Sequence, residues 1–152
     1  MNIEGSSIRM PDRSAKQIGV AIVEFNGRYL VGTRQEEQDL AGLAEFPGGK
    51  CESGESPADC AVRECREETG LCVFPIRLLK RTYHEYAHTT VDLHFWLCRV
   101  GGPNGEPPEN NSQPTNGFQW KGVDELRELS FPEANASVVQ TLISGTETTG
   151  KS

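Results

Sequence analysis

The sequence lacks any apolar run that approaches the roughly 20 residues needed to cross a bilayer. Its first residues, MNIEGSSIRMPDRSAKQ, carry charges without an apolar segment behind them, so they do not form a secretory signal. We therefore expect a chain that is neither inserted into a membrane nor exported, and that works in the cytoplasm.

Cysteine occurs, but not in a pattern that crosslinks a chain or binds zinc. The five cysteines are Cys51, Cys60, Cys65, Cys72 and Cys98. Their number is odd and no two are spaced as CxxC, which argues against both a disulfide framework and a structural zinc site. Free thiols in a reducing compartment are the simplest interpretation, and a role for Cys60 stays open at this point.

Positive charge is scarce. Lysine and arginine number 15 against 22 acidic residues, which gives a net charge of -7. An acidic chain lacks the excess of positive charge that binds the phosphates of duplex nucleic acid, so a nucleic acid polymer is not expected as a partner. A polyanionic substrate would need a local source of positive charge, and a bound metal ion is the obvious candidate.

The pattern of apolar residues predicts several strands. The 152 residues are 24% charged and 36% hydrophobic, which suits a globular chain with a sizeable core. Asn26-Gly27 follows an apolar stretch and is a strong signal for a type I′ hairpin. Strands are predicted at 18–23, 28–31, 76–86, 90–100 and 117–123, with a short extended piece at 45–49.

Two helices are predicted from their end signals and apolar faces. Ser56 suits the N-cap, Pro57 the first position and Gly70 the C-terminal stop of the first helix. The second helix is predicted over 132–143. The apolar side of the first helix, which should pack on a sheet, consists of Ala58, Ala61, Val62 and Cys65.

Strands mixed with two helices predict a single α/β layered domain. The domain is expected to span 16–144, between flexible tails at 1–15 and 145–152. The stretch 101–116 is rich in Gly, Pro and Asn and is expected to be a surface loop. No internal repeat or domain linker interrupts this organisation.

One helix face concentrates carboxylates. Glu64, Glu67 and Glu68 are spaced i, i+3, i+4, which places their Cβ atoms about 5–6 Å apart on one side of the helix. Carboxylates this close repel one another, so a compensating cation is expected, and hard oxygen ligands suit Mg²⁺ or Mn²⁺. The alternative that spacing alone leaves open is a solvated acidic face, partly neutralised by Arg63 and Arg66.

The segment from Gly48 to Leu71 resembles the Nudix box, G-x5-E-x7-R-E-U-x-E-E-x-G-U, in which U is a bulky apolar residue. The residues at the required spacings are Gly49, Glu55, Arg63, Glu64, Glu67, Glu68, Gly70 and Leu71. Cys65 takes the first U position as a small apolar residue. The resemblance implies an α/β/α sandwich with a mixed sheet, and a hydrolase of nucleoside diphosphates linked to another group.

The resemblance also implies roles for residues of the box. The metal ligands would be the Gly49 carbonyl and the carboxylates of Glu64, Glu67 and Glu68. Arg63 would brace the glutamates, and Glu55 would support them. Water would attack a phosphorus while Mg²⁺, or Mn²⁺, stabilises the leaving pyrophosphate. The catalytic residues expected on this basis are Arg63, Glu64, Glu67 and Glu68.

Outside the box the sequence is similar to the MutT subfamily, which removes 8-oxo-dGTP from the nucleotide pool. The similarity rests on EFPGGK at 45–50, HFWLC at 94–98 and FPEAN at 131–135, and it runs from about Lys16 to Ile143. It implies a small nucleotide substrate that is cleaved to the monophosphate and pyrophosphate. The substrate-binding residues that it implies are Arg34, Phe46, Lys50 and Asn135.

Three of these binding residues have a structural alternative. The amide of Asn135 can donate to and accept from a purine edge, which would discriminate tautomers, but Asn135 could also only cap a helix. Phe46 would line the purine pocket or belong to the core. Lys50 would neutralise phosphate or be solvated, and Arg34 would contact the nucleotide.

The sequence departs from the MutT pattern at two positions. Thr89 stands where an arginine is expected, and Pro114 stands where a late-loop glutamate would bind metal or act as the base. Glu106 and Glu109 lie in the same loop and could substitute for it. The identity of the general base and the preference for oxidised guanine therefore stay open.

A second motif, H-E-x-x-H, occurs at His84, Glu85 and His88 and is the mark of zinc metalloproteases when it lies on a helix. Here it lies between β-rich stretches, so we expect a strand end and turn instead. His94 falls within an alternating strand, where a hydrogen-bonded structural role is expected.

Two other functions compete with triphosphate hydrolysis. One is a Nudix-fold module that binds a nucleotide without cleaving it, although such a module has no need of all three glutamates. The other is a hydrolase of a different nucleoside diphosphate derivative, such as a dinucleoside polyphosphate or ADP-ribose. Turnover across a panel of substrates distinguishes them.

Overall fold

The computed structural model describes residues 15–38, 40–108 and 112–150, and of 146–150 only the backbone. In chain order the elements are β1 (Lys16–Phe25), β2 (Arg28–Thr33), β3 (Ala44–Glu45), β4 (Gly48–Lys50), α1 (Pro57–Thr69), β5 (Val73–Tyr86), β6 (Thr89–Val100), β7 (Gln119–Lys121), α2 (Val123–Glu128), the 3₁₀ turn η2 (Glu133–Asn135) and α3 (Ala136–Gly150).

The strands form one mixed sheet in the order β3-β2-β1-β6-β5, with β4 paired to β1 and β7 to β2. β1 runs parallel to β6, and its other pairings are antiparallel. β1 changes its partner along its length, because residues 18–20 pair with β4 whereas Glu24 and Phe25 pair with β2. The loop that carries β4 therefore joins the sheet beside the first half of β1.

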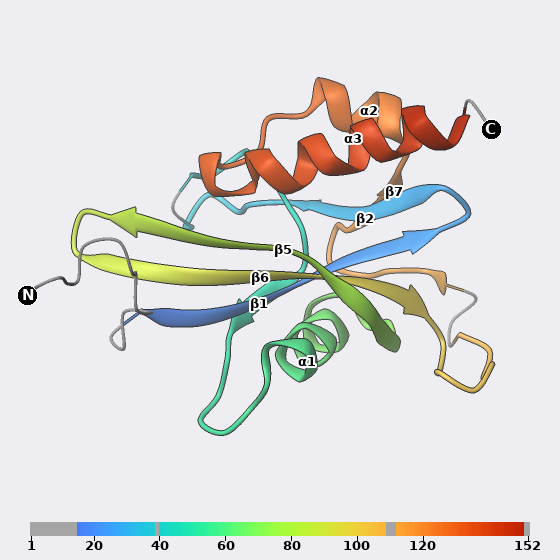
Figure 1. Cartoon of the computed structure of the whole chain (residues 1–152), viewed down its shortest axis with the longest axis horizontal. Coiled ribbons are helices and arrows are strands. Elements are labelled where there is room, and N and C mark those ends of the chain that lie inside the picture. The colour runs from blue at the N-terminus through green and yellow to red at the C-terminus, as the bar shows by residue number, and fades with distance from the viewer. Residues whose placement is uncertain (1–14, 39, 109–111, 151–152) are drawn as a thin grey trace, which may run out of the picture.

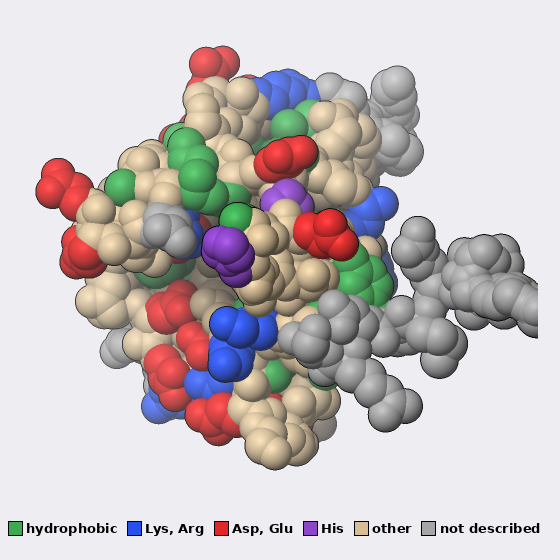
Figure 2. All heavy atoms as spheres, turned by 90° about the vertical axis from the view of Figure 1, so that its left-hand side faces the viewer, with side chains coloured by type: hydrophobic (Ala, Val, Ile, Leu, Met, Phe, Trp, Pro, Cys, Tyr) green, Lys and Arg blue, Asp and Glu red, His purple; other side chains and the backbone are tan. Residues whose placement is uncertain are grey.

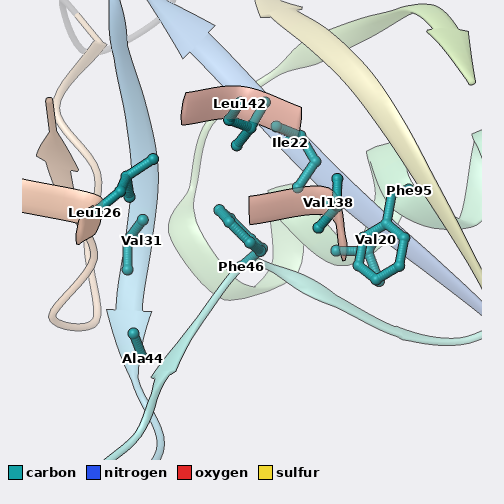
Figure 3. Packing of buried hydrophobic residues seen from close by; sticks show 9 residues of the cluster. All are labelled: Val20, Ile22, Val31, Ala44, Phe46, Phe95, Leu126, Val138 and Leu142. Carbon is teal, nitrogen blue, oxygen red and sulfur yellow. The ribbon is translucent and has the colours of Figure 1, made fainter. Parts of the chain in front are cut away.

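Helices cover both faces of the sheet, with α1 on one side and α2 and α3 on the other (Figure 1). This arrangement confirms the α/β/α sandwich. Alternate residues of β1 point to opposite faces, so Val20 and Ile22 pack toward α3 while Ala21 and Val23 pack toward α1. Figure 3 shows Phe46 and Phe95 in the layer on the α3 side.

α1 begins and ends as its sequence predicts. The Ser56 hydroxyl accepts a hydrogen bond from the Asp59 N–H at 3.1 Å, and Gly70 ends the helix at a φ of 80°. The helix lies so close to β1 that a methyl group on Gly19 would stand 2.5 Å from the Pro57 carbonyl oxygen. Glycine at position 19 thus fixes the height of α1 above the sheet.

The structure corrects several element boundaries. β1 extends to Phe25, β5 already begins at Val73, and the strand predicted over 117–123 is confined to Gln119–Lys121. α2 was not predicted, because a six-residue helix is too short to show a clear apolar period. The predicted closing helix over 132–143 is instead η2 followed by α3.

The expected flexible tails stay predictions. Residues 1–14 lie outside the described residues, and the backbone of α3 is helical to Gly150. A helical assignment does not measure flexibility, so the domain limits at 16 and 144 are not tested. Among the described residues, no helix is long and apolar enough to span a membrane.

Candidate active site

The loop of β4 and the carboxylates of α1 are in direct contact. A methyl group on Gly49 would lie 2.5–2.7 Å from the carboxyl atoms of Glu64, so the backbone at Gly49 packs against that carboxylate. One residue earlier, the Gly48 N–H donates to Oε1 of Glu68 at 3.3 Å. The two glycines let the strand approach the helix closely enough to place backbone groups among carboxylate oxygens.

Arg63 is the centre of the ion pairs on this side of α1. Its guanidinium donates twice to Glu55, at 2.7 and 2.9 Å, and once each to Glu64 and Glu67 at 3.1 Å. A further bond at 3.2 Å reaches the Lys50 carbonyl oxygen. The hydrogen bond from Arg63 lowers the pKa of Glu55 to about 2. The brace expected of Arg63 therefore has its contacts, and its effect on turnover stays a prediction.

Glu68 is the most perturbed carboxyl group of the site. Burial, followed by the hydrogen-bonded carboxyl group of Glu64, raises the pKa of Glu68 to about 8. The Glu45 carboxylate contributes to the same increase from across the site. Two partly buried acids side by side form a place where a cation would be strongly stabilised.

Glu67 is set apart from the other two glutamates. Its side chain is 57% exposed, against 17% for Glu64, and it points to Arg63. Within the described residues, no three or more His, Cys, Asp or Glu side chains form a group that could hold a metal ion. The structure therefore brings together Glu64, Glu68 and the backbone of Gly49, and Glu67 would have to leave Arg63 to join them.

These groups nevertheless fit the chemistry of Mg²⁺, because carboxylate and carbonyl oxygens are its protein ligands. The Gly49 carbonyl faces α1, since the Cys60 thiol donates a hydrogen bond to its oxygen at 3.2 Å. Cys60 is fully buried, and burial raises the pKa of its thiol to about 12, so it is a neutral donor. This contact gives Cys60 a place in the site that its position on the helix only suggested.

A cavity of about 460 Å³ opens from this point along the α3 side of the sheet. Gly48 and Gly49 line one end, and Arg34, Phe46 and Asn135 line its walls, so the structure brings these three predicted binding residues together. Lys50 is exposed and is not part of this lining. Its expected contact with phosphate stays a prediction.

The walls of the cavity combine apolar and polar groups. Phe46 is buried and stacks on Phe131 with ring centroids 4.9 Å apart, so it belongs to the core and to the cavity wall at once. Asn135 is half-buried at the end of η2, and its side chain hydrogen-bonds to no other residue within the described ranges. Its amide is therefore available to a ligand.

Among the polar side chains that line the cavity, reasoning from the sequence missed three: Lys16, Glu45 and Tyr86. Glu45 accepts a hydrogen bond from Arg34 at 3.2 Å, and burial raises the pKa of Glu45 above its ordinary value. The alternation of β1 contained one signal, because Lys16 shares a face with Ile18 and Val20. The positions of Glu45 and Tyr86 depend on tertiary contacts that no local pattern encodes.

The described part of the late loop does not supply an evident general base. Glu106 accepts a hydrogen bond from the Asn104 N–H at 3.0 Å within its own turn and does not line the cavity. Glu109 lies outside the described residues. The loop is fixed to α1 through Asn116, whose amide donates to the Glu68 carbonyl oxygen at 2.7 Å.

The H-E-x-x-H motif lies at the end of a strand and in the following turn, as expected. His84 and Glu85 belong to β5, and His88 lies in the turn before β6, so the helix that a zinc protease motif requires is absent from this described segment. His94 has the structural role predicted for it, with a hydrogen bond of 3.0 Å to the Gln17 side chain.

The chain is similar to a protein family, to individual relatives and to a solved structure. The model of the NUDIX domain family matches residues 19–141. The 8-oxo-dGTP diphosphatase of Escherichia coli K12 is 34% identical over 127 residues, covering 83% of this chain and 95% of the relative. That of Haemophilus influenzae is 35% identical over 139 residues, covering 89% and 96%. The solution structure of the E. coli ORF135 protein superposes with a TM-score of 0.68 at 26% identity, covering 89% of this chain and 94% of that one.

Proposed function

Because the chain belongs to the Nudix hydrolase family, we propose that it cleaves a nucleoside triphosphate to the monophosphate and pyrophosphate with Mg²⁺, and that 8-oxo-dGTP is its preferred substrate. The two diphosphatases that resemble it over most of their length support the choice of substrate. The five cysteines are free thiols, which supports the cytoplasmic location expected for an enzyme of the nucleotide pool.

The observation that carries the proposal is one continuous cavity. It joins the backbone of Gly48 and Gly49, next to the carboxylates of α1, to the amide of Asn135. Its volume of about 460 Å³ lies in the range of small-molecule sites. A nucleotide in this cavity would have its phosphates at the carboxylate end and its base near Asn135.

The carboxylate end offers the ligands for the metal. Glu64, Glu68 and the Gly49 carbonyl would hold Mg²⁺ or Mn²⁺, with Glu67 as a further ligand once it is released from Arg63. Such an ion supplies charge neutralisation for the phosphates and lowers the pKa of a bound water. Arg63 keeps Glu55 and Glu64 in place, so the carboxylates are positioned before substrate arrives.

At the other end of the cavity, the hydrogen-bonding groups of the Asn135 amide would select the base. In 8-oxoguanine the nitrogen at position 7 carries a hydrogen and oxygen 6 accepts, so one amide can accept from the first and donate to the second. In guanine position 7 is an acceptor, and the Asn135 amide would face it with a mismatched group. A buried mismatch of this kind is costly, which favours the oxidised base.

The test is kcat/KM for 8-oxo-dGTP against dGTP, followed by pyrophosphate release with Mg²⁺ and with EDTA as the blank. ADP-ribose and a dinucleoside tetraphosphate complete the panel, and Glu64→Gln serves as the inactive control. A preference for 8-oxo-dGTP of about 100-fold, equivalent to roughly 2.7 kcal/mol, supports the proposal. Faster turnover of another substrate contradicts it, and binding without turnover points to a non-catalytic module.

A further inference from the structure

The charges that line the cavity are not all matched. Among the residues that the structure describes, two basic side chains line it, Arg34 and Lys16. Arg34 forms an ion pair with Glu45 at 3.2 Å, and Glu45 is the acidic residue of the lining. Beyond the backbone pairing of β1 with β6, the Lys16 side chain forms no hydrogen bond or ion pair with another residue of the described ranges. It is thus the cation that the cavity can offer to a ligand.

Lys16 lies where the base of a nucleotide would lie. It points to the same face of β1 as Ile18 and Val20, and in the parallel register it stands beside Val91. Thr89, two residues before Val91 on the same face of β6, also lines the cavity. The start of β1, the β5–β6 turn and the start of α3 lie at one end of the molecule, which faces the viewer in Figure 2.

The metal end of the cavity is farther along β1. Gly49 pairs with Gly19, three residues beyond Lys16. At about 3.3 Å per residue this separates the two backbone positions by roughly 10 Å. Asn135, in contrast, lines the same cavity as Lys16 from the segment before α3. Lys16 therefore lies nearer to the position of the nucleoside than to the position of the phosphate groups at the carboxylates.

We propose that Lys16 is a specificity-determining residue whose ammonium group donates a hydrogen bond to a keto oxygen on the purine edge. The proposal rests on the function proposed above. A lysine has donors and no acceptor, so it favours the 6-keto or 8-keto oxygen of guanine-type bases over the 6-amino group of adenine. It also supplies, from β1, the positive charge that Thr89 cannot supply from β6.

The test is binding of nucleoside monophosphates in EDTA, measured by NMR titration of the full chain with 8-oxo-dGMP, dGMP and dAMP. Lys16→Met keeps the length of the side chain and removes its charge. It should reduce the preference for dGMP over dAMP, and for 8-oxo-dGMP over dAMP, about tenfold, because a hydrogen bond to a charged group is lost. Lys16→Arg, which keeps donors and charge, should retain most of the preference.

A matched control removes a lysine elsewhere. Lys121 on β7 forms an ion pair with Glu125 and does not line the cavity, so Lys121→Met should bind all three nucleotides as the parent protein does. An unchanged preference in Lys16→Met overturns the inference, and so does an equal loss of affinity for all three nucleotides, which would indicate a general charge effect.

Failure of the inference is distinguishable from failure of the proposed function. If the parent protein hydrolyses 8-oxo-dGTP selectively but Lys16→Met keeps its preference for keto bases, only the inference is wrong. If the parent protein binds keto purines through Lys16 but does not hydrolyse 8-oxo-dGTP, only the proposed substrate is wrong. A parent protein that binds none of the three monophosphates contradicts the inference, whereas the proposed function is decided separately by turnover of 8-oxo-dGTP with Mg²⁺.

Discussion

The carboxyl group of Glu64 occupies the space next to Gly49 in which a side chain would stand. A methyl group on Gly49 would lie 2.5 Å from Cδ of Glu64, whereas carbon atoms in contact are about 3.5–4.0 Å apart. The Glu64 carboxylate can therefore take this position only because residue 49 has no side chain. This contact places a backbone carbonyl and a carboxylate side by side at the end of the cavity.

Replacing Gly49 with alanine should reduce turnover far more than it reduces stability. The new methyl group has to displace the Glu64 carboxylate, and misplacing a catalytic group by about 1 Å can cost about 100-fold in rate. We expect at least that loss in kcat/KM with Mg²⁺, and a circular dichroism spectrum like that of the parent.

The matched control for this prediction is Gly122→Ala, since the nearest side-chain atom to a methyl group there is 3.9 Å away. It should keep parental turnover. Gly19→Ala is the opposite case, because its methyl group would press on the backbone of α1 and should lower the melting temperature as well. Parental activity in Gly49→Ala would show that Glu64 can move without consequence.

Mg²⁺ binding should release a proton from Glu68. Because burial and the Glu64 carboxyl group raise the pKa of Glu68 to about 8, the metal-free protein holds this proton at pH 7. Mg²⁺ affinity should therefore increase as pH rises and level off above about 8. Calorimetric titration with Mg²⁺ in two buffers of different ionisation enthalpy measures the proton count.

The same pKa has a consequence for the stability of the metal-free protein. The folded state holds the Glu68 proton up to pH about 8, whereas the unfolded state releases it near the ordinary value of 4.5. The free energy of unfolding should therefore decrease as pH rises between these values. Glu68→Gln should remove both this slope and the proton release, and a variant that keeps them would assign them to another group.

Asn135→Ala should reduce discrimination between 8-oxo-dGTP and dGTP rather than turnover of both. The amide is half-buried, lines the cavity and has no partner in the described part of the chain, so its loss leaves the core intact. We expect a loss of selectivity of about tenfold, the value of one hydrogen bond to a base edge. An equal loss for both nucleotides, measured as kcat/KM, would mean that Asn135 only shapes the start of α3.

The part of the site that could be predicted from the sequence is the part that is local in the chain. The cap of Ser56, the stop at Gly70 and the spacing of the three glutamates lie within one helix, where geometry follows directly from residue number. Sequence spacing places Glu67 and Glu68 each about one turn from Glu64, on the same side of the helix. It does not show that Arg63 binds Glu67 and holds it toward solvent.

The part that could not be predicted depends on pairing between distant strands. Lys16 and Thr89 line the same cavity because β1 runs parallel to β6, a pairing that spans most of the domain. The interactions of Glu45 with Arg34 and Glu68, which influence the pKa values of the two acids, likewise depend on how these residues lie in the folded chain. Long-range pairing has no local sequence pattern, so these residues could be identified only in the folded chain.

An ionic network around a buried aspartate lies on the face of the sheet opposite the cavity. Asp92 is completely buried and accepts two hydrogen bonds from Arg81, at 3.0 and 2.9 Å, and one from Gln17 at 2.8 Å. It thus links β5, β6 and β1. Burial alone would raise the pKa of Asp92, but the bonds from Arg81 and Gln17 outweigh it and hold the pKa below its ordinary value.

Asp92→Asn should lower the free energy of unfolding by about 2 kcal/mol at pH 7, because it removes hydrogen bonds between charged groups. The folded-state pKa is depressed, so the contribution of Asp92 is fully present above the unfolded value of 3.8 and is lost as pH falls through the folded value. Urea unfolding at pH 7 and at lower pH should show the difference between parent and variant shrinking in acid.

Asp124→Asn is the control, since that carboxylate is 96% exposed and its ion pair with Arg127 should contribute little. Equal effects of the two substitutions would show that the hydrogen bonds of Asp92 do not stabilise the fold.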